Sequence, residues 1–154
     1  MGHTYTNLLT HIIFSTKDRL PYLLEDRRYD VFSYIGGIVR ETKGAAINVN
    51  GVQDHVHVLV RLPSFLPVAK AVEIMKTNSS RWIHEQRVLH QTFAWQAGYA
   101  AFSVSESQLD NVSRYITNQQ AHHQRVSFRV SFQEELIAFL ERAHIQYDER
   151  YIWR

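Results

Sequence analysis

Two kinds of hydrophobic pattern alternate along the first two-thirds of the chain. Residues 4–16 (TYTNLLTHIIFST) are rich in β-branched and aromatic side chains, which predicts a strand. From Glu25 to Lys43 apolar residues recur every three or four positions, which predicts an amphipathic helix that ends near Gly44. The chain therefore starts with a strand followed by a helix.

The same alternation continues to residue 105. Residues 46–52 and 55–62 are short strand-like runs separated by two residues, which predicts an antiparallel hairpin. Residues 68–87 have helical spacing, and residues 95–105 (WQAGYAAFSVS) predict a strand with a break at Gly98. The order is β-α-β-β-α-β, so we predict an α+β fold with a ferredoxin-like core and an antiparallel sheet.

Two more helices are predicted after this core, at about 108–124 and about 132–144. The second lies in a C-terminal extension of about 130–154, whose aromatic tail we expect to pack on the body of the protein. We find no internal repeat and no flexible linker, so residues 1–154 are interpreted as a single domain.

Composition narrows the function classes only slightly. The formal net charge is +2 and the basic residues are mostly arginine, which suits phosphate contacts but is common in other proteins. The absence of cysteine excludes disulfides, zinc-thiolate sites and iron–sulfur clusters, so any metal must be bound by other side chains. No signal peptide or membrane span is evident, and we expect a cytoplasmic protein without membrane contact.

The first candidate site is the His55-Val56-His57 sequence in the predicted strand 55–62. Side chains at positions i and i+2 of a strand project from the same face, so the two imidazoles could bind one divalent cation. The alternative is a pair of packed or exposed histidines without a metal.

The second candidate site is the helix at about 108–124. Tyr115 and Gln119 are one helical turn apart and project together. The phenol and the amide could serve as nucleophile and third metal ligand if this helix crosses the histidine strand. Otherwise Tyr115 covers the core and Gln119 is a hydrated edge residue.

Taken in order, the His55-Val56-His57 strand, the WQAGYAAFSVS run and the YITNQQAHH segment from Tyr115 to His123 resemble one known family. They are similar to the HUH-superfamily single-tyrosine transposases of small insertion sequences, a group that includes the REP-associated tyrosine transposases. The resemblance extends from Thr4 to Tyr151.

This resemblance implies a function and a partner. It implies that His55 and His57 bind a divalent ion, with Mg²⁺ or Mn²⁺ expected, that Gln119 completes the protein ligands, and that Tyr115 is the nucleophile. The expected activity is cleavage and rejoining of single-stranded DNA at hairpin-marked ends through a 5′-phosphotyrosine intermediate. The resemblance also implies a homodimer whose subunits share the active sites.

Residues that contact the DNA are harder to identify. Basic residues near the second helix could form a phosphate track, and aromatic residues could stack on unpaired bases; the candidates are Arg61, Lys70, Lys76, Arg81, Arg87, Trp82, Trp95 and Tyr99. The alternative for each is a solvated charge or a core aromatic. Glu134 and Glu135 begin the last helix, where carboxylates suit the positive helix end, and we interpret both as structural.

Two other functions remain open from the sequence. A replication initiator or relaxase-like nickase would share the histidine and tyrosine chemistry but usually has additional domains. A hairpin-binding module without cleavage would bind nucleic acid with no covalent adduct and no metal dependence.

Overall fold

The computed structural model describes residues 2–119, 132–150 and 152. Within these residues four strands form one antiparallel sheet in the order β2-β3-β1-β4. The strands are β1 (Leu8–Ser15), β2 (Ala45–Gly51), β3 (His55–Leu62) and β4 (Ala100–Ser103). The hairpin partners β2 and β3 are adjacent, while β1 inserts between β3 and β4.

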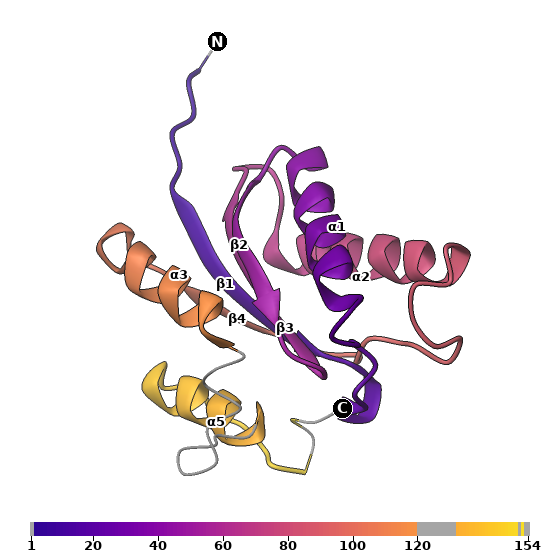
Figure 1. The fold of residues 1–154 in the computed structure, drawn as a ribbon. Helices are drawn as coiled ribbons and strands as arrows, with labels where there is room; N and C mark the ends of the chain where they lie inside the picture. The colour runs from indigo at the N-terminus through magenta and orange to yellow at the C-terminus, as the bar shows by residue number, and fades with distance from the viewer. Residues whose placement is uncertain (1, 120–131, 151, 153–154) are drawn as a thin grey trace.

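Helices cover both faces of this sheet. The helices α1 (Arg28–Glu41) and α2 (Val68–Glu85) lie on one face, and α3 (Leu109–Thr117) and α5 (Phe132–Arg142) lie on the other (Figure 1). Two short 3-10 turns, η1 (Lys17–Arg19) and η2 (Glu106–Gln108), follow β1 and precede α3. The central strands β1 and β3 are therefore largely buried on both faces.

Strand alternation divides the residues of β3 between the two faces. Val56, Val58 and Val60 are fully buried in the main core, which α1 and α2 cover. His55 and His57, at the alternate positions, must point to the α3 and α5 face. One strand thus contributes to the main core with one set of side chains and to the candidate site with the other.

A smaller apolar cluster attaches α5 to the histidine face of the sheet. Its buried members are Ile13, Phe132, Leu136 and Leu140. Tyr147 and Ile152 pack against it, in agreement with the expectation that the aromatic tail contacts the body. Because these contacts fix α5 beside β1 and β4, residues of the last helix can reach the histidines.

The predicted α+β fold class and element order are confirmed, but several boundaries differ. The first strand begins at Leu8, later than predicted, and β4 covers only 100–103 of the strand predicted at 95–105. The carbonyl oxygens of residues 96 and 98, in the part of the predicted strand that precedes β4, accept hydrogen bonds from Lys76 Nζ at 2.9 and 2.6 Å.

The helix predicted at about 108–124 is shorter in the structure, because α3 ends at Thr117 with Asn118 as its C-cap. Residues 120–124 of that prediction lie outside the described residues. Among the helices that the structure describes, none is long and apolar enough to cross a lipid bilayer.

Candidate active site

The two histidines of β3 follow a tight turn and are completely buried. A Cβ at Gly51 would collide with the carbonyl oxygen of His55, so only glycine allows the chain to return this closely. His55 and His57 both have 0% exposure, and their ring centroids are 5.1 Å apart. The turn and the strand therefore hold two imidazoles side by side, away from solvent.

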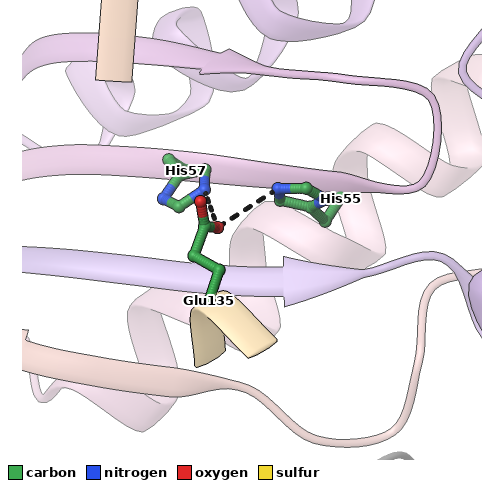
Figure 2. Close-up of side chains that lie close together, drawn as sticks. All are labelled: His55, His57 and Glu135. Atoms are coloured by element: carbon green, nitrogen blue, oxygen red, sulfur yellow. Dashed lines mark hydrogen bonds and ion pairs between the residues drawn. The ribbon is translucent and has the colours of Figure 1, made fainter. Parts of the chain in front are cut away.

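A carboxylate from α5 lies between these imidazoles. Oε1 of Glu135 is 3.0 Å from Nε2 of His57 and 3.5 Å from Nε2 of His55 (Figure 2). The three potential ligand atoms all lie within 4.8 Å of one another. Two imidazole nitrogens and one carboxylate oxygen at this separation fit the donor set of a single divalent cation.

The outer nitrogen of each imidazole has a different partner. Nδ1 of His55 is 2.8 Å from Oδ1 of Asp54, whereas Nδ1 of His57 is 2.8 Å from Nε2 of His11 on β1. Burial alone would lower the pKa of His55, but its hydrogen bonds to Asp54 and Glu135 raise that pKa to about 9. Burial and the neighbouring His57 instead lower the pKa of His11 to about 3, so its ring is neutral.

Two asparagines of the edge strand β2 place α3 over the sheet. Nδ2 of Asn48 donates to the Ser113 carbonyl oxygen at 3.0 Å and to Oγ1 of Thr117 at 2.9 Å. Nδ2 of Asn50, which is paired with His57 in the strand register, donates to the Ile116 carbonyl oxygen at 2.9 Å. These side-chain bonds bind the backbone of the helix on either side of Tyr115.

Tyr115 consequently reaches the same carboxylate as the histidines. Its hydroxyl donates a hydrogen bond to Oε2 of Glu135, and its ring lies edge-on to His57 with centroids 5.9 Å apart. Burial, followed by the negative charge of Glu135, raises the pKa of Tyr115 above its ordinary value. The phenol is therefore held protonated, with its proton directed at Glu135.

Gln119, one turn further along the chain, also faces the site. It is fully buried, and its Oε1 lies 3.3 Å from Nε2 of His55. The structure thus brings together, within one chain, all four residues selected from the sequence: Tyr115, His55, His57 and Gln119.

Sequence reasoning missed two residues of this site. Glu135 was assigned with Glu134 to the positive end of the last helix, but the structure directs it to the histidines, while Glu134 is exposed. The available signal was its position on the apolar stripe formed by Phe132, Leu136 and Leu140. His11 was also missed, although it is the one imidazole in β1, a largely buried and mostly apolar strand.

Most of the residues predicted to bind DNA lie on the other side of the sheet. The α2 residues Lys70, Lys76, Arg81 and Trp82 belong to the face opposite the histidines, and Arg87 follows that helix. Trp95 is 9% exposed, and its Nε1 donates to Ser79 Oγ at 2.9 Å, so it is a core residue.

Arg61 and Tyr99 are the candidates nearer the histidine face. Arg61 is on β3 in the same alternation as the histidines, where its guanidinium pairs with Glu106 at 3.2 Å. Tyr99, just before β4, is 42% exposed and is among the residues that line a cavity with Leu136.

Comparison with known proteins assigns the family. A family model described as IS200-like transposase matches residues 4–119, which is most of the chain, so this protein belongs to the IS200-like transposase family. The resemblance drawn from the sequence is therefore confirmed. No curated protein matches the chain.

Solved structures show the same fold. A candidate transposase from Deinococcus radiodurans R1 aligns with a TM-score of 0.60 at 21% identity, covering 77% of this chain and 96% of that one. A REP-associated tyrosine transposase bound to a REP hairpin aligns with a TM-score of 0.59 at 14% identity, covering 82% of this chain and 75% of that one. At these identities the likeness concerns the fold.

Proposed function

We propose that this transposase cleaves and rejoins single-stranded DNA at hairpin-marked ends, with Tyr115 as nucleophile and a divalent metal bound by His55 and His57. The observation that carries the proposal is the convergence on Glu135. Its Oε1 lies 3.0 Å from Nε2 of His57, and its Oε2 accepts the hydroxyl of Tyr115. Metal ligands and nucleophile thus meet at one buried carboxylate.

The third protein ligand can come from either of two side chains. Gln119, two residues after the end of α3, supplies a neutral amide oxygen, and Glu135 supplies an anionic oxygen from α5. Carboxylate is the harder and more strongly charged ligand, which suits Mg²⁺ or Mn²⁺. We therefore assign Glu135 to the metal site alongside His55 and His57, with Gln119 as an additional oxygen ligand.

The chemistry would form one bond and break one. The phenolic oxygen of Tyr115 attacks phosphorus and its proton passes to Glu135, while the bond from phosphorus to the 3′ oxygen breaks. The 3′ oxygen takes up one proton, from Glu135 or from water, so the DNA leaves with a free 3′-hydroxyl and the protein keeps a 5′-phosphotyrosine. Oε2 of Glu135 already accepts the hydrogen bond of this phenol and is placed to take its proton. A bound divalent cation would neutralise a non-bridging phosphate oxygen and so allow an anionic group to be attacked.

Rejoining uses the same residues in reverse, because a second 3′-hydroxyl can attack the phosphotyrosine. The attacking 3′-hydroxyl gives its proton to the Glu135 carboxylate or to water, and the released phenolic oxygen of Tyr115 takes up one proton in turn. No nucleotide hydrolysis is required, since the phosphotyrosine ester retains the energy of the phosphodiester bond that was broken.

The expected partners are a DNA hairpin and a second copy of the chain. The structural neighbour that is bound to a REP hairpin supports hairpin recognition by this fold. The histidines, Tyr115 and Glu135 meet within one chain, so we propose a homodimer without requiring that α3 be exchanged between subunits. Light scattering of the purified protein tests the dimer separately from the chemistry.

Incubation with a labelled single strand that carries the hairpin and flank of its own gene tests the proposal. Wild-type protein should give a covalent protein–DNA band on a denaturing gel only when Mg²⁺ or Mn²⁺ is present, and Tyr115→Phe should give none. Tyr115→Phe should still shift the hairpin in a native gel. Binding by the wild type with no covalent band under any metal condition would instead favour a hairpin-binding module.

A further inference from the structure

The outer nitrogen of His57 meets another imidazole instead of a carboxylate. Nε2 of His11 lies 2.8 Å from Nδ1 of His57, and the two rings stack with centroids 5.0 Å apart. His11 is 2% exposed and packs edge-on against Phe139, with ring centroids 5.3 Å apart. A buried polar ring among aromatic neighbours is costly unless its hydrogen bond is made.

Metal binding would impose one arrangement of protons on this pair. The atom of His57 that faces the metal site is Nε2, which must offer its lone pair to a cation. A neutral imidazole then carries its single proton on Nδ1, the atom that faces His11. Two N–H groups cannot share a 2.8 Å contact, so Nε2 of His11 must be unprotonated and His11 must carry its own proton on Nδ1.

We propose that His11 is a positioning residue for the metal site, accepting the Nδ1 proton of His57 and so holding the His57 Nε2 lone pair toward the metal. This inference rests on the metal-binding role proposed above for His57. Partners of this kind fix the tautomer and the ring orientation of a ligating histidine. His11 would fix the tautomer and orientation of His57 as a neutral ring, without adding a negative charge beside it.

The two metal-binding histidines would then be held in different ways. Asp54 accepts from Nδ1 of His55 with a carboxylate, whereas His11 accepts from Nδ1 of His57 with a neutral ring. Each ring is fixed at its outer nitrogen, and both inner nitrogens are directed at Glu135 (Figure 2).

The test compares two replacements of His11 in the full-length protein. His11→Phe keeps an aromatic ring against Phe139 but removes the acceptor, whereas His11→Gln retains an acceptor oxygen at a similar reach. The readout is the Kd for Mn²⁺, measured by electron paramagnetic resonance without DNA. We expect His11→Phe to weaken binding by about 10- to 100-fold and His11→Gln by less than about threefold.

Two controls separate this inference from the proposed function. If His57→Ala binds Mn²⁺ as tightly as the wild type, the metal site itself is misassigned and the role of His11 fails with it. If His57→Ala loses binding but His11→Phe retains wild-type affinity, only the role of His11 is refuted. Equal losses in His11→Phe and His11→Gln would also refute it.

A spectroscopic measurement on the wild type needs no His11 variant. Long-range ¹H–¹⁵N spectra of the Zn²⁺-loaded protein should show His57 with a protonated Nδ1 and a metal-bound Nε2. They should show His11 protonated on Nδ1 alone. Coordination of His57 through Nδ1, or a proton on Nε2 of His11, would overturn the proposal even if His11→Phe does not fold.

Discussion

Replacing Glu135 with glutamine isolates the charge at the centre of the site. Glu135 is 3% exposed, its Oε1 lies 3.0 Å from Nε2 of His57, and its Oε2 accepts a hydrogen bond from the Tyr115 hydroxyl. Glutamine has nearly the same volume, but it is neutral and one of its two acceptors becomes an NH₂ donor. Packing is therefore retained while the charge-assisted hydrogen bonds are lost.

Two effects follow from this loss. Without metal, loss of a charge-assisted buried hydrogen bond should lower the free energy of unfolding by about 1.5–3 kcal/mol. For a domain of this size, each kcal/mol corresponds to about 2–4 °C in melting temperature, so the melting temperature should fall by roughly 3–12 °C. With metal, we expect an anionic ligand to be worth at least about tenfold in Mn²⁺ affinity, or about 1.4 kcal/mol. In excess Mn²⁺ the stabilisation by metal should shrink by this amount.

Thermal denaturation with and without Mn²⁺ measures both effects, and the adjacent glutamate provides a matched control. Glu134→Gln removes the same charge from the same helical turn, but its side chain is exposed. It should therefore retain the wild-type response to Mn²⁺. If Glu135→Gln and Glu134→Gln show the same melting temperatures and the same response to Mn²⁺, Glu135 is not part of the metal site.

Two further predictions concern groups outside the proposed metal ligands. Lys76→Met should lower the free energy of unfolding, measured in urea, by about 2 kcal/mol, because the Lys76 ammonium donates hydrogen bonds to the carbonyl oxygens of Gln96 and Gly98. The control Lys70→Met, at an exposed position, should change it by less than about 0.5 kcal/mol. Equal effects of the two substitutions would contradict this role of Lys76. The pKa of His11 is lowered to about 3 from an ordinary 6.5, so between these pH values the unfolded chain binds a proton at His11 and the folded chain does not. As the pH falls from 6.5 to 3, the free energy of unfolding of the metal-free protein should therefore decrease by up to about 1.4 kcal/mol per pH unit through this residue. The decrease should be smaller in His11→Gln. Identical pH profiles of the wild type and His11→Gln would exclude His11 as the cause.

The sequence was sufficient to predict the fold class because local patterns determine it. The alternation within β3 separates Val56 and Val58 from the two histidines, and this split is what the structure shows. The same alternation did not define the length of β4. There, a long-range contact from Lys76 takes up backbone carbonyl oxygens that a longer strand would have paired.

The missed residues depend on tertiary contacts. Glu135 is 78 positions from His57, and long-range packing, including that of Phe132 and Leu136 in one cluster with Ile13, brings α5 over the sheet. A carboxylate on the apolar stripe of a helix is the local sign of such a contact, since burying an unpaired charge there would be costly. The asparagines of β2 that position α3 carry no comparable sign, because a neutral polar side chain on an edge strand can equally well face water.

The central claim is that Tyr115 forms the covalent bond to DNA, and identification of the modified residue tests it most directly. After reaction with single-stranded hairpin DNA and Mn²⁺, the protein is digested with nuclease and trypsin and analysed by mass spectrometry. Trypsin cuts after Arg114, so the peptide that begins at Tyr115 should carry the mass of a 5′-linked nucleotide on that tyrosine. A nucleotide attached to any other residue would contradict the account, as would cleaved DNA without a modified peptide.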